Sequence, residues 1–299
     1  YGYQFTLFRF ALTPEPPQRS TAWAAQSVYL GHLAVTDIEA MRFHTRQKLS
    51  RGGALGLAGA SVEPVIIWLE DWQIQGKEAT HWPLRIQAQT NDLGIDITLH
   101  PEKPVVLQGD RGLSRKGPQP GNASYYYSVP RLDTRGTLTI DGAVTTITGR
   151  SWMDREWGSS VLGEGVAGWD WFALHLADGR DVMFYHLRRE DGSGDALSRG
   201  VVIDSSGEVQ PLRADEVSLT VTSRWESPVT GIAYPVGWQL EIPTMKLTLE
   251  VRSRILAQEW TEPIRYWEGA VSVSGSVDGV GYLEMTGYDK RKSNKVWNR

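Results

Sequence analysis

The stretch GRSWMDREWGSSVLGEGVAGWDWFALHLADGRDVMFYHLR, residues 149–188, decides the fold of this chain. It holds four of the 13 tryptophans and two of the six histidines, among many acidic residues and arginines. Tryptophan beside charge is typical of a partly buried polar site or of a ring stacked on a cation. Residues 169–176 and 181–188 flank the sequence ADGR, and Asp-Gly between two apolar runs is the strongest short hairpin signal. The stretch therefore predicts a central β-hairpin.

The turn residues predict the register of this hairpin. A two-residue turn at Asp178 and Gly179 places Trp171 opposite His186, and side chains then alternate between two faces. One face carries Trp169, Trp171, Ala173, His175, Val182, Phe184, His186 and Arg188. The other carries Asp170, Phe172, Leu174, Leu176, Asp181, Met183, Tyr185 and Leu187. We expect the second face to line a barrel interior, with Asp170 and Tyr185 as its inward polar groups.

Composition excludes several classes of function. The 299 residues carry a net charge of -4, so there is no basic field for nucleic acid. The absence of cysteine excludes disulfides, thiolate catalysis and cysteine-ligated metals. No apolar run approaches the ~18 residues of a membrane span, and we expect no transmembrane segment. The chain opens on YGYQFTLFRF without Met, which predicts a processed amino terminus.

Short alternating segments follow one another along the chain, with turn residues between them. They lie at residues 1–12, 28–36, 41–49, 64–73, 84–90, 94–99, 136–140, 144–149, 200–204, 217–225, 238–242, 247–254, 266–274 and 279–287. A helix from Thr36, with Glu39 completing a capping box, is the alternative to a strand pair joined around Asp37. Residues 101–122, rich in Pro, Gly and charge, predict a long surface loop. The pattern predicts an all-β barrel or sandwich.

A weak internal repeat divides the chain. The sequence YYY at 125–127, followed by GTLTIDGAVTTITGR, recurs as YWE at 266–268, followed by VSVSGSVDGVGYLEMTGY. Two related β units explain this repeat better than one large barrel. We place the boundary between residues 155 and 156, so that the predicted domains are residues 1–155 and 156–299.

Seven segments carry a resemblance to a known family. They are YGYQFTLFRF, GHLAVTD, RGGALGLAGA, IWLEDWQ, TGRSWMDREWGS, GWDWFALHLADGRDVMFY and GYLEMTGY. Together they resemble the AttH-like family of predicted secreted hydrolases, which is grouped with carotenoid 1,2-hydratase (hydroxyneurosporene synthase). The resemblance covers almost the whole chain. It implies two tandem lipocalin-like β-barrel domains and an export signal, hence a periplasmic or secreted protein.

The resemblance also implies a class of chemistry. The hydratases of this group add water to an isoprenoid double bond by acid catalysis without a cofactor, and related lipocalin-like proteins guide polyene cyclisation. We therefore expect an apolar, isoprenoid or polyene-like ligand and cofactor-free hydratase or cyclase chemistry, with no cofactor. The sequence has no GxSxG motif, and no Ser stands out in a triad arrangement, so no nucleophile is visible for the hydrolase activity in the family name. A non-catalytic lipid or small-molecule carrier and a cell-envelope attachment scaffold are the alternatives.

Acid catalysis on an apolar molecule needs a proton donor in a dry pocket and aromatic faces beside the developing cation. Asp170 lies between Trp169 and Trp171, where burial would keep its carboxyl protonated. We predict Asp170, Tyr185 and His186 as catalytic residues. In the alternative structural interpretation Asp170 pairs with an arginine such as Arg155 or Arg188.

Further residues are predicted to line the ligand site. They are Trp72, at a strand end, and Trp152, Asp154, Glu156, Trp157, Trp169, Trp171 and His175. An interdomain salt-bridge network packed by tryptophan is the alternative role for residues 154–156. The histidines are dispersed without HxH or HExxH spacing, and we predict no metal. An enclosed carboxylate with a raised pKa would favour the enzyme over the carrier and the scaffold.

Overall fold

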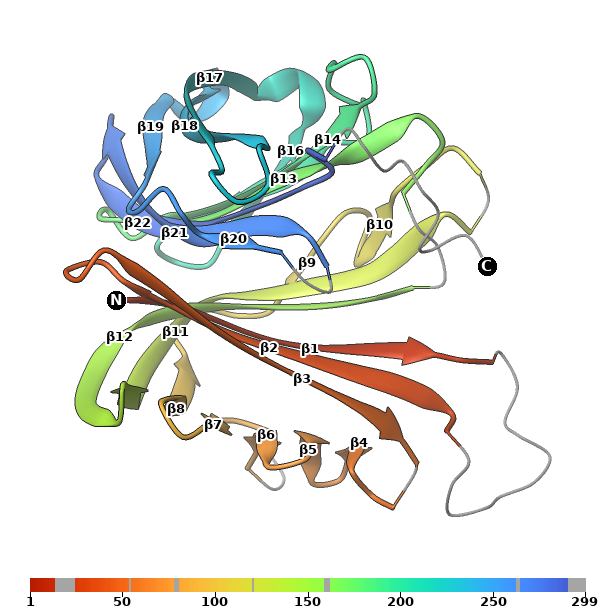
Figure 1. Ribbon diagram of the computed structural model, residues 1–299. Coiled ribbons are helices and arrows are strands. Elements are labelled where there is room, and N and C mark those ends of the chain that lie inside the picture. Colours follow the sequence, from red (N-terminus) through yellow and green to blue (C-terminus); the bar gives the residue numbers. More distant parts are fainter. Residues whose placement is uncertain are drawn as a thin grey trace.

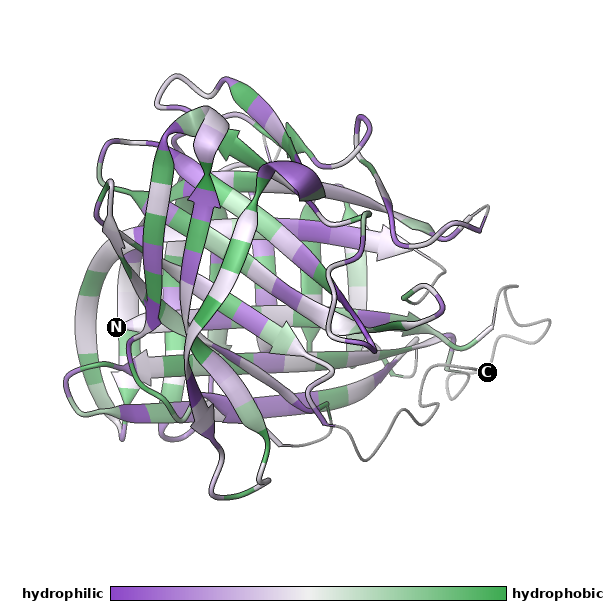
Figure 2. Ribbon diagram, turned by 90° about the horizontal axis from the view of Figure 1, so that it is seen from above, coloured by the Kyte–Doolittle hydropathy of each residue, from purple (hydrophilic) through white to green (hydrophobic). Residues whose placement is uncertain are grey.

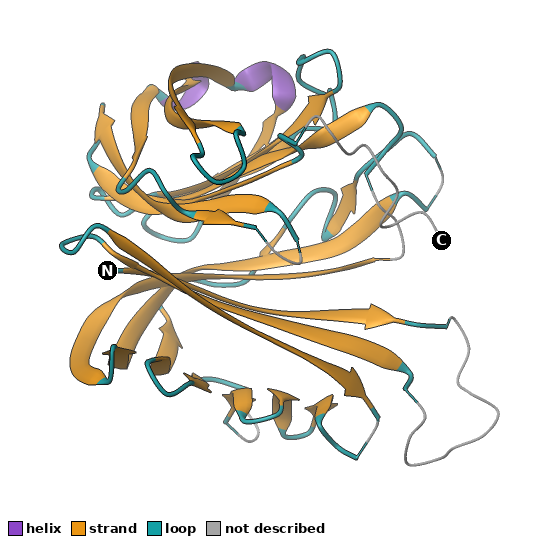
Figure 3. Cartoon of the chain, viewed as in Figure 1, coloured by secondary structure: helices purple, strands orange, loops and turns teal. Residues whose placement is uncertain are grey.

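Almost every element of the described chain is a β-strand. The computed structural model describes residues 1–13, 25–53, 55–77, 81–119, 121–158, 162–261 and 264–289. Strands and loops account for these residues apart from two single 3-10 turns, Ala214–Glu216 and Pro243–Met245 (Figure 3). The predicted all-β class is confirmed. Among the described residues, no helix has the length and apolar character needed to cross a membrane.

The chain begins with a three-stranded antiparallel sheet. Its strands are β1 (Gly2–Ala11), β2 (Ser27–Asp37) and β3 (Arg42–Gly52), in that order. The strand pair predicted around Asp37 is confirmed and the helix alternative is wrong. An Asp37 carboxylate oxygen accepts the Ala40 N–H at 3.1 Å, and Met41 takes a left-handed φ of 54°, which closes a turn instead of starting a helix.

A second sheet of nine strands completes the amino-terminal half. It contains β4 (Ala58–Val62), β5 (Val65–Leu69), β6 (Trp72–Gly76), β7 (Leu84–Gln89), β8 (Leu93–Pro101), β9 (Val106–Leu107), β10 (Leu113–Arg115), β11 (Ala123–Ile140) and β12 (Ala143–Gly158). It encloses an apolar core with β2, to which Leu33, Trp72 and Ile97 contribute. Apolar and polar residues alternate along the strands because their side chains point to opposite faces (Figure 2).

A ten-stranded sheet forms the carboxy-terminal half. It contains β13 (Val166–Leu176), β14 (Asp181–Arg189), β15 (Arg199–Ile203), β16 (Val209–Arg213), β17 (Ser218–Glu226), β18 (Ala233–Ile242), β19 (Leu247–Ser253), β20 (Glu259–Trp260), β21 (Tyr266–Gly275) and β22 (Gly279–Thr286). The sheet curls around a dense core that includes Phe172, Trp238 and Trp267. Its interior is therefore filled by its own side chains.

The first sheet lies between strands β4–β8 of the second sheet and the carboxy-terminal half. In Figure 1 the ribbon of β1–β3 crosses the molecule between β4–β8 and the group β13–β22. The Thr36 hydroxyl donates to the Gln258 side-chain oxygen at 2.6 Å, which joins β2 to the carboxy-terminal half. The predicted domain boundary after residue 155 falls inside β12, and the division into residues 1–155 and 156–299 stays a prediction.

The segment of residues 101–122 corrects one expectation. It is rich in Pro, Gly and charge, yet it is no simple surface loop: it contains β9 and β10 and buries Lys103, Val106 and Ser114. Val106 packs in a cluster with Met183 and Tyr185 of β14. Local composition predicted exposure because it cannot register that a second unit covers this loop.

The sequence repeat corresponds to two hairpins. The first is β11–β12, whose strands meet at Ile140 and Ala143, and the second is β21–β22. Asp141 and Gly142 both have positive φ, 51° and 80°, as a two-residue hairpin turn requires. These two hairpins carry most of the carboxyl groups described next.

Candidate functional site

A cavity of about 4320 Å³ is lined by residues of both halves, including side chains of β1, β12, β13, β21 and β22. A typical small-ligand pocket has a volume of about 300–1,000 Å³. This cavity is therefore a broad cleft, several times larger than one such pocket. Polar and aromatic groups concentrate where β11 and β12 approach β13, β21 and β22. The Trp152 and Trp171 rings, one from each half, lie there at 6.4 Å in an edge-to-face contact.

Asp154 of β12 is the polar centre of the amino-terminal wall. Its carboxylate accepts hydrogen bonds from the Tyr126 hydroxyl at 2.6 Å, the Ser128 hydroxyl at 2.5 Å and the Trp152 indole N–H at 2.7 Å. Burial raises the pKa of Asp154 to about 6, although these three donors act in the opposite direction. Asp154 therefore changes charge close to neutral pH.

Glu268 and Glu284 form the opposite wall. They are directly opposite each other on β21 and β22, and two like charges at such a position repel. Burial, and then the charge of Glu284, raise the pKa of Glu268 well above its ordinary value. Burial raises the pKa of Glu284 to about 7, opposed by a 2.8 Å hydrogen bond from the Trp169 indole. The pKa of Glu268 therefore lies well above its ordinary value, whereas Glu284 titrates near neutrality.

Two unpartnered polar atoms lie on the same wall. Among the described residues, Glu268 Oε2 and the Tyr282 hydroxyl are buried without a hydrogen-bond partner. Glu268 as a whole is only 4% exposed, and both residues line the cavity. Buried polar groups are normally satisfied, so an unsatisfied pair beside a cavity is a place where a ligand or a water can bind.

The two walls are joined by hydrogen bonds and aromatic packing. Trp171 is the cross-strand neighbour of Glu284, and its indole N–H donates to the Tyr126 hydroxyl at 3.1 Å. Tyr126 in turn donates to Asp154. Lys116 adds a cation that lies 4.7 Å from the centre of the Tyr185 ring and 2.7 Å from Glu156. The site therefore requires both halves of the molecule.

The central hairpin has a different register from the one predicted. Trp171 is opposite Tyr185, and His186 is opposite Asp170, one residue away from our expectation. The loop after Leu176 closes through Arg180, whose carbonyl accepts the Leu176 N–H, so the turn is longer than two residues. A shift of one residue exchanges the two faces of β14. Tyr185 thus shares the cavity face with Trp169 and Trp171, and the predicted inward pair of Asp170 and Tyr185 is wrong.

Asp170 lies on the other face of the sheet, fully buried. Its Oδ1 accepts from Arg188 at 2.7 Å and from the Tyr288 hydroxyl at 2.8 Å, and the guanidinium is 3.7 Å from the Tyr288 ring centre. Burial raises the pKa of Asp170, and Arg188 opposes that shift. Burial lowers the pKa of its neighbour His186. The arginine pairing that we weighed as the alternative is therefore the observed arrangement, with Arg188.

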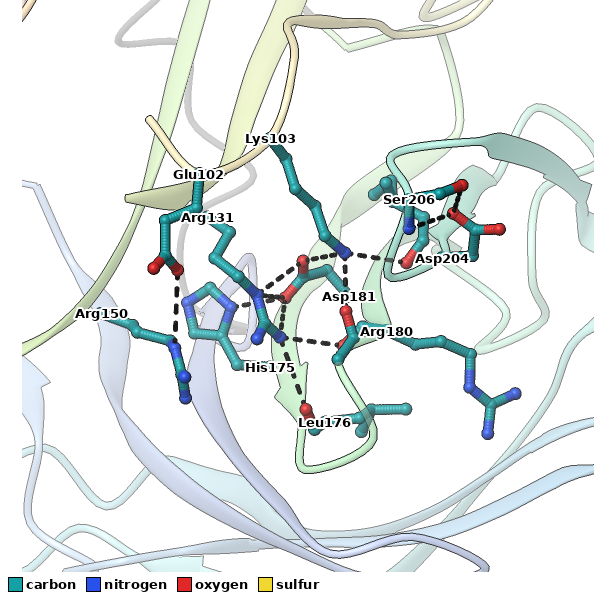
Figure 4. Close-up of polar contacts among 12 residues, drawn as sticks. Glu102, Lys103, Arg131, Arg150, His175, Leu176, Arg180, Asp181, Asp204 and Ser206 are labelled. Carbon is teal, nitrogen blue, oxygen red and sulfur yellow. Dashed lines mark hydrogen bonds and ion pairs between the residues drawn. The ribbon is translucent and has the colours of Figure 1, made fainter. Parts of the chain in front are cut away.

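His175 belongs to a buried ionic cluster around Asp181. The Asp181 carboxylate is contacted by His175 Nδ1 at 2.6 Å, by Lys103 Nζ at 2.7 Å and by Arg131 at 2.8 Å (Figure 4). Lys103 and Arg131 belong to the amino-terminal half, whereas Asp181 lies on β14. Lys103 also donates to the Gly179 carbonyl at 2.7 Å. Among the described residues, this cluster supplies the ion pairs between the halves, whereas Glu156 pairs with Lys116 of its own half.

With this geometry established, comparison with known proteins places the chain in a family. The AttH-like family model matches residues 1–288. The chain belongs to the AttH-like family. A crystal structure of a protein assigned to AttH, from Nitrosomonas europaea, matches with a TM-score of 0.84 at 31% identity, over 96% of this chain and 87% of that one.

Two curated fungal relatives are more distant. The dehydratase asqC of Emericella nidulans is 25% identical over 218 residues, and kievitone hydratase of Fusarium solani subsp. phaseoli is 24% identical over 213. These matches cover 66% and 67% of this chain but 57% and 59% of the relatives.

A solved kievitone hydratase from Nectria haematococca shares the fold, with a TM-score of 0.71 at 17% identity over 96% of this chain and 89% of that one. Together with the AttH structure, it confirms the predicted pair of tandem lipocalin-like barrels.

The structure of this AttH-like protein distributes the predicted ligand-site residues unevenly. Those that line the cavity are Trp152, Asp154, Glu156, Trp157, Trp169, Trp171 and His175. Trp72 instead is fully buried in the amino-terminal core, where its indole N–H donates to the Gln89 carbonyl. Trp157 is 53% exposed at the rim and stacks on Tyr125.

Sequence reasoning did not select Glu268, Glu284 or Tyr126. Their signal was present in the repeat: YYY and YWE occupy equivalent places, and Glu284 lies in the second copy of the hairpin. An isolated Glu in an alternating strand resembles a solvated outer face, however. Only the packing of the two halves turns that face inward.

In the part of the chain that the structure describes, no three His, Asp or Glu side chains are grouped so as to hold a metal ion. The absence of a metal or cofactor from the reaction stays a prediction.

Proposed function

We propose that this protein is a cofactor-independent hydratase or dehydratase that binds an apolar, isoprenoid or polyene-like small molecule between its two halves. The observation that carries the proposal is a set of three buried or partly buried carboxyls whose pKa values are raised to different extents, among tryptophan and tyrosine rings. Carboxyls with separated pKa values are the arrangement that divides general acid from general base.

Hydration begins with protonation of an alkene carbon. Glu268, whose raised pKa favours the protonated form, is the donor in this step; the alkene π pair forms the new C–H bond and leaves a carbocation. The faces of Trp169 and Trp171 stabilise that cation. Water forms the C–O bond, and its extra proton passes to the Asp154 carboxylate, with Glu284 as the second candidate. The sum is the addition of one water once this proton has returned to Glu268, and the reverse sequence is dehydration.

The names of the fungal relatives support this class of reaction, since one is a hydratase and the other a dehydratase. The chain spans less than two thirds of their length, so their activities support the proposal without establishing it for this chain. The catalytic trio first predicted, Asp170, Tyr185 and His186, stays a hypothesis. Its members lie on two faces of the sheet, and Asp170 is already held by Arg188.

The test starts from ligand capture. The protein is exposed to an organic extract of its host, and the retained compounds are identified by native mass spectrometry. They are then incubated with the protein in ¹⁸O-labelled water. A hydratase yields a product heavier by one labelled water, and Glu268→Gln should slow its formation by about 10²–10⁴-fold.

Glu208→Gln is the matched control, because Glu208 is exposed in a turn far along the chain from the cavity strands. It should retain the wild-type rate. Asp170→Asn decides whether the acid is Glu268, as proposed, or Asp170, as the sequence predicted. Retention of a compound that the wild-type protein never converts would refute the enzyme and identify a carrier.

A further inference from the structure

The two ring nitrogens of His175 lie in different surroundings. His175 is on the cavity face of β13, where Trp169 and Trp171 precede it at alternate positions. Its Nδ1 is 2.6 Å from Oδ1 of Asp181, the cross-strand neighbour on β14 (Figure 4). Its Nε2 makes no hydrogen bond among the described residues and yet is not a fully buried atom, so it is open to the cavity that the ring lines.

The contact with Asp181 places the ring hydrogen on Nδ1. Burial alone would raise the pKa of Asp181, but hydrogen bonds from His175, Arg131 and Lys103 hold it below its ordinary value, so this group is a carboxylate at neutral pH. A carboxylate has no hydrogen to donate, and the bond therefore runs from Nδ1–H to Oδ1. Since a neutral imidazole has one N–H and one acceptor nitrogen, Nε2 presents its lone pair to the cavity.

The groups around this ring include both signs of charge. Asp181 of β14 attracts a proton on the imidazole, whereas Arg131 and Lys103, paired with the same carboxylate, oppose it. The Glu102–Arg150 pair, at 3.8 Å, lies beside this cluster (Figure 4). The remaining neighbours, Trp152 of β12 and Val280 of β22, are uncharged. A proton taken up at Nε2 is therefore stabilised by one carboxylate and can be released again.

His175 also lies next to the aromatic part of the cavity. Its ring centre is 6.2 Å from that of Trp152, which contacts Trp171 and donates its indole N–H to Asp154 at 2.7 Å. The Asp154 carboxylate already accepts three hydrogen bonds from the protein, of about four that a carboxylate can accept. The single acceptor position of His175 Nε2 is unused in the described structure. His175 is thus the less occupied proton acceptor of the two.

We propose that His175 is a further catalytic residue: Asp181 holds its Nδ1–H, and Nε2 takes the proton of the water that adds to the substrate cation. The water oxygen forms the C–O bond, one of its O–H bonds breaks, and that electron pair stays on oxygen. The imidazolium keeps its bond to Asp181, and its extra proton returns through solvent to Glu268. A buried Asp that orients a His in this way is also found in serine hydrolases.

This base takes the proton whose first candidates were Asp154 and Glu284, so its use rests on the proposed function. The orientation of the ring does not, because it is a property of the folded chain.

The orientation is tested first, on the full-length protein without substrate. Protein with ¹⁵N-labelled histidine is examined by two-bond ¹H–¹⁵N NMR at neutral pH, and the His175 signals are assigned as those lost in His175→Gln. If that variant does not fold, His175→Ala serves for the assignment. We expect a protonated Nδ1 and an unprotonated Nε2. The opposite tautomer overturns the proposal, and so does a ring protonated at both nitrogens, because neither leaves an acceptor toward the cavity.

The role as a base is tested in the labelled-water assay. His175→Gln keeps a side-chain N–H for Asp181 but has no basic nitrogen, and it should slow hydration by about 10²–10⁴-fold. His175→Ala should be equally slow and should recover activity when free imidazole is added, since the cleft is broad enough to admit this small base. A purely structural ring would give no such recovery. His100→Gln is the control, because His100 is exposed at the end of β8, and it should retain the wild-type rate.

The two proposals fail in different ways. If the wild-type protein hydrates its ligand and His175→Gln does so at the same rate, the base is wrong and the hydratase stands. If the wild-type protein converts no retained compound, the proposed function is refuted together with this base, and the NMR result still decides the orientation of the ring.

Discussion

Replacing Asp181 by Asn tests how the two halves are held together. Asp181 is fully buried and its carboxylate faces two cations from the other half, Lys103 and Arg131, whose side chains are 4% and 9% exposed. Asn keeps the shape of the side chain and removes the charge. Both cations would then lie in a poorly solvated place without a counter-charge.

The expected cost follows from this geometry. Removing one partner of a buried ion pair costs about 3–5 kcal/mol, since the remaining charge is left uncompensated. The entropy of unfolding is about 2.1 cal/mol/K per residue, or about 0.6 kcal/mol/K for a chain of this length. If the two halves unfold together, Asp181→Asn should therefore lower Tm by about 5–8 °C.

Differential scanning calorimetry and urea titration measure this change. Asp110→Asn is the control, because Asp110 is 80% exposed and contacts Arg111 at 3.4 Å, so its effect should stay within about 0.5 kcal/mol. Adding Lys103→Met to Asp181→Asn should recover part of the loss by removing one uncompensated cation.

The pH dependence of stability tests whether the Asp181 carboxylate stabilises the fold in its charged form. Burial alone raises the pKa of Asp181, but hydrogen bonds from His175, Arg131 and Lys103 more than offset it, and the pKa lies below its ordinary value. The cluster should therefore stabilise the fold above the ordinary Asp pKa and lose that effect as pH falls through the lowered value. A loss below about 1 kcal/mol in Asp181→Asn would refute the assignment of the cluster as an interdomain clamp.

Three further changes test other parts of the argument. The pKa of Glu284 is raised from 4.5 to about 7, so the contribution of Glu284 to wild-type stability falls as pH rises between these values. Glu284→Gln should remove up to about 3 kcal/mol of this pH dependence, which urea midpoints below and above this pH range would measure. Arg188→Met should cost about 3–5 kcal/mol at neutral pH by leaving Asp170 without its cation, whereas addition of Asp170→Asn should restore much of the loss in the same titration. Gly168→Ala places a Cβ 2.2 Å from the Thr286 carbonyl oxygen of β22 and should lower stability by about 1–3 kcal/mol. Gly149→Ala is the control, because a Cβ there meets open space and should leave stability unchanged. Equal melting temperatures for the two variants would contradict this packing.

The register of each hairpin and the packing of the two halves decide which face of a strand lines the site. The residues Trp169, Trp171 and Asp154 were recognisable because aromatic and acidic groups are concentrated in one stretch. The role of Tyr185 was assigned to the wrong face, since a turn one residue longer than expected reverses every side chain of β14. Glu268 and Glu284 lay in the repeated hairpin but were not selected, because alternation alone does not distinguish a solvated face from one covered by a second domain.

The sequence by itself determined the all-β class, the central hairpin, the repeat of two related units and the family. These follow from local patterns: alternation, turn residues and long shared motifs. Tertiary structure alone decided that Glu268, Glu284 and Asp154 line one cavity. It also decided that Asp181 pairs with Lys103 and Arg131 of the other half, and that His32 of β2 is hydrogen-bonded to Tyr266 of β21, 234 positions later. The raised pKa values arise only there, because burial and like charge act through space and not along the sequence.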